Sequence, residues 1–158
     1  MLTLIQTLTP YGAVLVYASE LPNSQQLGDA LASYVSQGGG VVLMGESTVA
    51  HMRGQLASQG LMPWTVTPAD VSGGDSGSNE TVADATTATE SLTLVPTDAA
   101  SELLVNVSTL TIANATISNA TFTLTDGAVL AANWSNTQPL AGYLNSTSGG
   151  GIVAAINM

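Results

Sequence analysis

The first half of the chain combines short apolar runs with a segment of helical periodicity. Residues 12–18 form a continuous apolar run, which predicts a strand buried on both faces. A helix capped by Asn23 or Ser24 follows, because apolar residues recur at the spacing of one helical face: Leu27, Ala30, Leu31, Tyr34 and Val35. Glycines 38–40 end this helix with a left-handed cap, and residues 41–44 form a second buried strand. Strand, helix and strand in this order predict a right-handed parallel unit.

The pattern changes after a second helix, which is predicted to begin at Ser47. Residues 67–90 are poor in large apolar residues and rich in Gly, Ser, Thr and Asp, so they predict a long loop or insertion. Short strand-like runs then follow one another: 91–95, 103–107, 109–112, 121–125, 128–134, 139–144 and 151–157. Asp126-Gly127 predicts a hairpin turn between two of these runs. We therefore expect residues 1–158 to form a single α/β domain with a β-rich second half.

The composition excludes several classes of function. Of 158 residues, 45% are hydrophobic and only 8% are charged, and the formal net charge is -10. Arg53 is the only basic residue, so the chain cannot build a surface that neutralises nucleic-acid phosphates or binds an anionic membrane. No apolar run approaches the roughly 18 residues of a membrane span, so membrane insertion is not expected. The absence of cysteine excludes disulfides, thiolate metal sites and a cysteine nucleophile, and we expect neither a metal nor a cofactor.

Acceptor sites for N-linked sugar are unusually frequent. Six of the nine asparagines stand in Asn-X-Ser/Thr sites, where chance predicts about two. All six lie in the second half of the chain: Asn79, Asn106, Asn114, Asn119, Asn133 and Asn145. N-glycosylation at these positions implies an extracellular or cell-surface protein. Because glycans cannot be buried, the second half would form a sugar-coated exterior and leave the first half free to contact another protein.

Two stretches resemble a known family. Residues 11–47, YGAVLVYASELPNSQQLGDALASYVSQGGGVVLMGES, together with the LASQGLM that follows, resemble the class I glutamine amidotransferase-like superfamily, which includes the DJ-1/PfpI and ThuA-like branches. Residues 126–158, DGAVLAANWSNTQPLAGYLNSTSGGGIVAAINM, are similar to the closing strands of ThuA-like modules. The resemblance implies a flavodoxin-like parallel sheet flanked by helices.

The same resemblance implies that the family's chemistry has been lost. The nucleophilic cysteine of the family matches Gly45, and the histidine that follows it matches Glu46. Glycine offers no nucleophile. Ser47 could act as a displaced nucleophile, but Val49 stands where a nucleophile elbow needs a second glycine. The single histidine, His51, would share one helix with Ser47, and that geometry suits a catalytic base poorly.

Two acidic residues complete the predicted pocket. Glu20 and Glu46 follow successive predicted strands, at the sheet edge where such folds open a crevice, and as a pair they could carry acid/base chemistry. Polar residues at strand ends are nevertheless common without any function. We call the following set the degenerate pocket: Glu20, Gly45, Glu46 and Ser47.

Two other groups of residues favour ordinary structural roles. The acidic loop formed by Asp70, Asp75, Asn79 and Glu80 lacks the ligand spacing of an EF-hand, which favours a solvated loop over a calcium site. The two tryptophans, Trp64 and Trp134, could stack on sugar rings, although isolated tryptophans are more often core or interface residues.

The N-terminus departs from the family, in which a first strand occupies the middle of the sheet. Met1–Pro10 has neither the basic region nor the cleavage site of a signal peptide, so either a signal has been removed or the chain belongs to something longer. A central gap in the sheet would leave backbone groups unpaired. Three solutions are open: the chain is a segment of a longer protein, Met1–Pro10 fills the gap, or a neighbouring subunit donates the strand.

These observations together predict a non-catalytic, N-glycosylated extracellular structural module. Its expected setting is a surface layer, sheath or filament, and its expected partners are further copies of itself or other segments of a longer surface protein. The alternative is a secreted carbohydrate-binding or degenerate hydrolase domain that uses the crevice at the strand ends.

Overall fold

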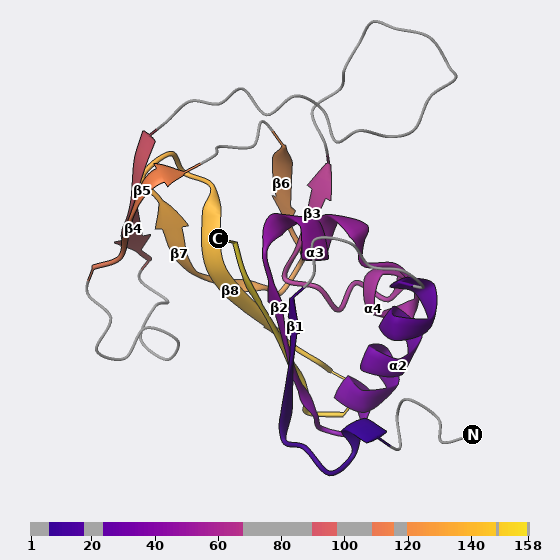
Figure 1. The fold of residues 1–158 in the computed structure, drawn as a ribbon. Helices are drawn as coiled ribbons and strands as arrows, with labels where there is room; N and C mark the ends of the chain where they lie inside the picture. The colour runs from indigo at the N-terminus through magenta and orange to yellow at the C-terminus, as the bar shows by residue number, and fades with distance from the viewer. Residues whose placement is uncertain are drawn as a thin grey trace, which may run out of the picture.

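The computed structural model describes residues 7–17, 24–67, 90–97, 109–115, 120–147 and 149–157. Within these residues strands predominate, with nine strands (β1–β9) and three helices (α2–α4). The helices gather at one side of the molecule, beside β1 and β2, while β4, β5 and β7 lie at the other side (Figure 1). The predicted insertion at 67–90 lies outside the described residues except at its two ends.

The predicted strand–helix–strand unit is confirmed. β1 (Ala13–Tyr17) and β2 (Gly40–Met44) pair in parallel, and α2 (Ser24–Ser36) connects them. The glycine cap also forms, since Gly38 adopts φ 91° and its N–H donates to the carbonyl of Val35. Local periodicity was enough to find this unit, because the apolar stripe of α2 packs directly on the strands it connects.

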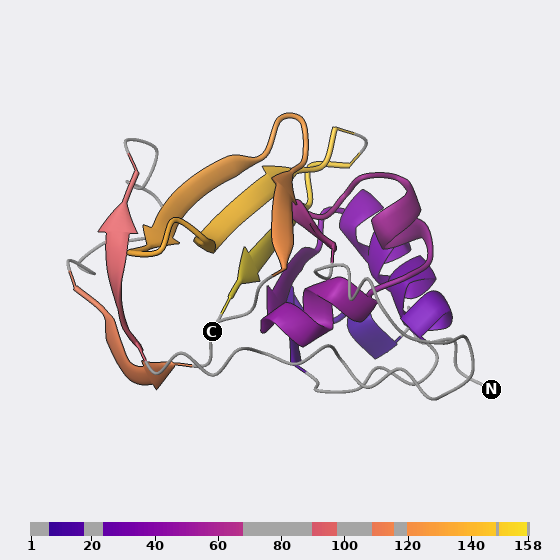
Figure 2. The same cartoon turned by 90° about the horizontal axis from the view of Figure 1, so that it is seen from above.

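The sheet that contains this unit is mixed and curled. Its strand order is β1-β2-β9-β8-β7-β4-β5. β9 (Ile152–Ile156) pairs in parallel with β2 and antiparallel with β8 (Pro139–Asn145). β7 (Val129–Trp134), β4 (Glu90–Pro96) and β5 (Thr111–Ala115) continue the sheet with antiparallel pairs. Seen from above, the strands bend round into a half-barrel (Figure 2).

The prediction of a flavodoxin-like parallel sheet flanked by helices is therefore wrong. Parallel pairing is limited to β1, β2 and β9, and the described helices cover only this end of the sheet. Parallel strands need a long crossover connection, whereas β7, β8 and β9 follow one another through short connections that favour antiparallel pairing. The central gap for which three solutions were open does not arise, because β9 pairs directly with β2.

The helix predicted from Ser47 is broken into two short helices. α3 (Glu46–His51) begins at Glu46 after Gly45, so Ser47 is not its cap, and α4 (Gln55–Ser58) follows after Gly54, which has φ 75°. Arg53 stands in the break and donates a hydrogen bond to the carbonyl of Ala50 at 2.7 Å. The only basic side chain of the protein thus satisfies a carbonyl near the end of α3.

The predicted Asp126-Gly127 turn forms, but the predicted hairpin does not. Gly127 adopts φ 78° between β6 (Thr121–Leu124) and β7. However, β6 pairs antiparallel with β3 (Trp64–Thr67), a strand that the sequence pattern did not reveal, and these two strands form a separate small sheet. The turn chemistry is local, whereas the choice of partner strand depends on residues far away in the chain.

Two hydrophobic cores lie on opposite faces of the main sheet. The larger core joins residues of all three helices to inward residues of β2 and β9, among them Val41, Leu43, Val153 and Ala155. The smaller core contains Leu94, Ala132, Trp134, Leu140 and Ala141, with Ile156 packed against it. Since Ala155 and Ile156 are neighbours in one strand, they point to opposite faces.

The strand at residues 12–18 is not buried on both faces. β1 lies at the end of the sheet, and its residues alternate between exposed and half-buried. Val14 and Val16 pack against the larger core, while Leu15 and Tyr17 are exposed. Because β1 is an edge strand with apolar residues on both of its faces, its sequence pattern is the same as that of a strand buried on both faces.

Candidate functional site

The degenerate pocket is only partly within the described structure. Gly45 lies buried in the turn between β2 and α3, with φ 89°, and its N–H donates to the carbonyl of Ile156 at 2.8 Å. The backbones of Glu46 and Ser47 begin α3, but their side chains and the whole of Glu20 lie outside the described residues. The role of these side chains therefore stays a prediction.

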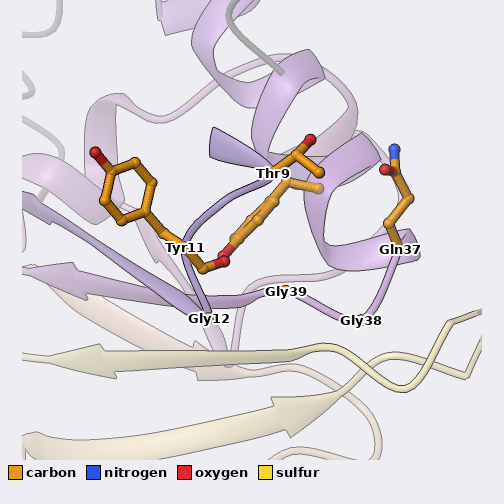
Figure 3. A pocket seen from close by; sticks show the side chains of 7 residues that line it. Thr9, Tyr11, Gly12, Gln37, Gly38 and Gly39 are labelled. Atoms are coloured by element: carbon orange, nitrogen blue, oxygen red, sulfur yellow. The ribbon is translucent and has the colours of Figure 1, made fainter. Parts of the chain in front are cut away.

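A small cavity of about 170 Å³ lies at the opposite end of the parallel strands. It is lined by residues that precede β1, by Tyr34 of α2 and by the glycine turn after α2: Thr9, Tyr11, Gly12, Tyr34, Gln37, Gly38 and Gly39 (Figure 3). The hydroxyl of Tyr34 donates to the backbone carbonyl of Tyr11, so this polar atom already has a protein partner. Ligand pockets usually measure about 300–1,000 Å³. The cavity is smaller than this range, and it lies at the end of the strands away from Gly45.

Three of the six glycosylation sites fall within the described residues. Asn145 is exposed at the end of β8, and Asn133 is half-buried in β7. Asn114 belongs to β5, although its side chain is not described. The remaining sites lie outside the described residues: Asn79, Asn106 and Asn119. Among the described side chains, Asn145 offers the most accessible attachment point.

Both tryptophans are core residues. Trp64 is fully buried in the larger core, and Trp134 is 3% exposed in the smaller one. The indole N–H of Trp134 donates to the carbonyl of Asn157 at 2.9 Å. Neither ring has a free face on which a sugar could stack.

The most distinctive surface is one face of the parallel end of the sheet. Register pairs place successive rows of residues side by side on this face, which we call the apolar face: Ala13, Gly40 and Ile152; Leu15, Val42 and Ala154; Tyr17, Met44 and Ile156. None of these nine residues is charged. The described helices pack on the other side of the same strands.

Several members of the apolar face are open to solvent. Leu15 is 59% exposed, Tyr17 is 72% exposed and Ile152 is 46% exposed. The ring of Tyr17 lies beside the turn at Gly45, about 3.7 Å from where a side chain on that glycine would begin. Contiguous exposed apolar residues on a sheet usually mark a contact surface.

The free edge of β1 adjoins this face. Among the described strands, β1 pairs only with β2. The N–H of Gly40 donates to the carbonyl of Gly12 at 3.0 Å. Because backbone direction alternates along a strand, the groups of Val14 and Val16 also point toward β2, whereas those of Ala13, Leu15 and Tyr17 point outward. Outward backbone groups and exposed side chains therefore belong to the same three residues.

The comparisons with known proteins concern the fold. No family model and no curated protein sequence matches the chain. The similar solved structures include the "mmIFT52 N-terminal domain", with TM-score 0.56, 16% identity and coverage of 97% of this chain and 68% of that one. They also include "Cytoplasmic Protein STM3548 from Salmonella typhimurium", with TM-score 0.54, 15% identity and coverage of 99% of this chain and 63% of that one. The chain thus spans less than two thirds of the second structure.

These findings correct the predicted family. Neither of these structures is described as a glutamine amidotransferase-like protein, and no family model supports that membership, so the predicted resemblance is wrong. The segments quoted for it describe a β-α-β unit and closing strands, which many unrelated folds share. At identities of 15–16%, the similar structures indicate a shared fold. No helix in the described part of the chain is long and apolar enough to cross a membrane.

Proposed function

We propose that this protein is a non-catalytic structural module that assembles at a cell surface or outside the cell and carries N-linked sugar. The observation that carries the proposal is the exposed, uncharged apolar face beside the edge of β1 that no other described strand pairs with. A monomer in solution would expose these apolar residues to water, at a free-energy cost of about 25 cal/mol per Å² of apolar surface. Contact with another protein removes that cost.

The position of the glycosylation sites supports the same proposal. All six lie between Asn79 and Asn145, whereas β1 and β2 belong to the first third of the chain, which has no such site. The exposed Asn145 ends β8 and stands opposite Ile152 in the register, so sugar there would border the Ile152 end of the apolar face, away from the row that contains Tyr17 and Met44. Sugar on the second half would keep that surface hydrated, and β1 and β2 would stay available for contact.

The scarcity of side chains suited to catalysis supports a role without catalysis. The chain has no cysteine and only one histidine, and Arg53 is its one basic residue. The backbone carbonyl of Ala50 already receives a hydrogen bond from that guanidinium. The alternative, a carbohydrate-binding or degenerate hydrolase domain, depends on the degenerate pocket, and no described contact favours it.

Native material with its glycans intact would test the proposal. We expect intact mass spectrometry to show sugar on several of the six asparagines, and sedimentation with negative-stain imaging to show assemblies larger than one chain. A native protein that carries no glycan, or that sediments only as a monomer at every concentration, would contradict the proposal.

A further inference from the structure

We propose that two copies of this chain associate through antiparallel pairing of their β1 strands, which joins the two curled sheets into one continuous sheet. This inference deepens the proposed assembly function, on which it rests, by naming the partner and the contact. It starts from the direction of the backbone in Ala13–Tyr17.

The outward backbone groups of β1 are complementary to themselves. In an antiparallel pair, residues that face each other across the ladder exchange both hydrogen bonds. Placing a two-fold axis at Leu15, the centre of the strand, sets Leu15 opposite Leu15 of the second copy and Ala13 opposite Tyr17 of the second copy. All of these residues point their N–H and C=O groups outward, so about six hydrogen bonds can form between the copies.

The side chains fit the same arrangement. Directly opposed residues share a face of the sheet, so the apolar faces of the two copies become continuous. The large ring of Tyr17 meets the small Ala13 of the second copy, and the leucines meet at the axis. No like charges oppose each other in the paired strands, because Ala13–Tyr17 contains only apolar residues and one tyrosine.

The sequence of β1 lacks the features that normally protect an edge strand. Edges are usually blunted by lysine, proline, bulges or short length. β1 contains neither lysine nor proline, and its register with β2 is regular through all five residues, so it has no bulge. β5, at the other end of the sheet, differs: the β4–β5 register shifts between Glu90 and Leu92, and β5 contains the glycosylation site at Asn114. The asymmetry favours β1 as the contacting edge.

The exposed area sets the strength of the contact. Of the exposed apolar residues, only Leu15 and Tyr17 lie in β1, whereas Ile152 lies in β9, two strands in from the edge, so pairing at the edge buries only a small apolar area. A stable interface buries roughly 800 Å² per partner. The pairing therefore predicts a weak dimer that forms as concentration rises. Its formation should be favoured by added salt, which screens repulsion between two chains of charge -10.

Sedimentation of the full chain and of two matched variants tests the pairing. Leu15→Lys places two like charges opposite each other at the two-fold axis, so we expect it to raise the dimer dissociation constant about tenfold or more. Leu124→Lys is the control, because Leu124 is also a leucine of similar exposure, at 45%, but lies in β6 of the other sheet. It should dimerise like the unmodified protein.

Hydrogen exchange provides a second measurement that does not depend on a variant. The amides of Ala13, Leu15 and Tyr17 should exchange quickly in dilute solution and become protected as the concentration rises, while those of Val14 and Val16 should be protected throughout. Outward amides that stay unprotected at concentrations where the protein is dimeric would overturn the pairing.

The outcomes also separate this inference from the proposed function. If the native protein assembles and Leu15→Lys associates as strongly as Leu124→Lys, the β1 contact is wrong while the assembly role stands. If the native protein is monomeric under all conditions, the pairing and the proposed function both fail.

Discussion

Asp29 in α2 accepts a hydrogen bond from the backbone N–H of Gln55, the first residue of α4, at 2.7 Å. The residue before Gln55 is Gly54, which has no side chain to cap the helix. A carboxylate from a different helix thus satisfies an N–H that would otherwise have no partner within α4. This bond joins α2 to α4.

The first prediction concerns this bond. Asp29→Ala should lower the free energy of unfolding by about 1 kcal/mol, the usual cost of losing a helix-capping side chain. Asp29→Asn retains a carbonyl oxygen at the same position, so its free energy of unfolding should fall by less. Urea unfolding followed by circular dichroism measures both variants. Equal losses for the two substitutions would show that the charge, rather than the acceptor atom, stabilises this junction.

The second prediction concerns the close approach of α2 to the segment before α4. A Cβ atom on Gly28 would lie 1.7 Å from the carbonyl oxygen of Arg53, which is backbone and cannot move aside cheaply. We expect Gly28→Ala to destabilise the protein by about 3 kcal/mol, the upper range for overpacked positions.

Gly12→Ala is the matched control for that substitution. A Cβ on Gly12 meets nothing within 4 Å, so this variant should unfold within about 0.5 kcal/mol of the unmodified protein. Thermal melts of both variants, compared directly, check the pair. If Gly28→Ala melts together with Gly12→Ala, the helices are farther apart than the structure places them.

The third prediction compares the two buried tryptophans. The indole N–H of Trp134 bonds to the carbonyl of Asn157, whereas Trp64 carries the one buried side-chain nitrogen or oxygen without a hydrogen-bond partner among the described residues. Trp134→Phe loses a hydrogen bond, worth about 1 kcal/mol, as well as ring volume. Trp64→Phe loses similar volume but also removes an unpaired donor, which offsets part of the cost. Trp134→Phe should therefore lower the urea midpoint more, and the reverse order would contradict the contrast in hydrogen bonding.

The fourth prediction concerns the exposed end of β8. Asn145→Gln should remove the mass of one glycan from the native protein and leave its unfolding midpoint nearly unchanged, because Asn145 is exposed. Asn136→Gln is the control, since Asn136 lies in no acceptor site and its substitution should not alter the glycan mass. Intact mass spectrometry distinguishes the two. An unchanged mass in Asn145→Gln would mean that this position carries no sugar.

The sequence predicts the elements that depend on contacts between residues close together in the chain, and it does not predict those that depend on distant residues. The α2 unit and its glycine cap were predictable because Leu31 and Val35 recur at helical spacing and Gly38 is next to the helix end. The pairing of β2 with β9 was not, since Val42 and Ala154 are brought together across most of the chain. No local pattern carries information about such a contact.

The candidate surface was concealed for a related reason. Leu15 and Tyr17 stand in an uninterrupted apolar run, and such a run is typical of strands buried on both sides. Whether the second side is covered depends on which strand takes the edge and where the helices pack. Leu15 and Tyr17 were predicted to be buried but are exposed, and they are the residues that we assign to contact with a second copy.

The central place of β9 has a consequence for how the chain folds during synthesis. β9 is the last of the described strands to leave the ribosome, yet it is the strand that joins β2 to β8. Until Ile152–Ile156 emerge, the parallel unit and the antiparallel strands cannot be connected, and β2 has a second open edge. Non-local pairings of this kind form slowly, and unpaired edges are prone to mispairing in the meantime. We expect nascent chains stalled before β9 to be the form most dependent on chaperones.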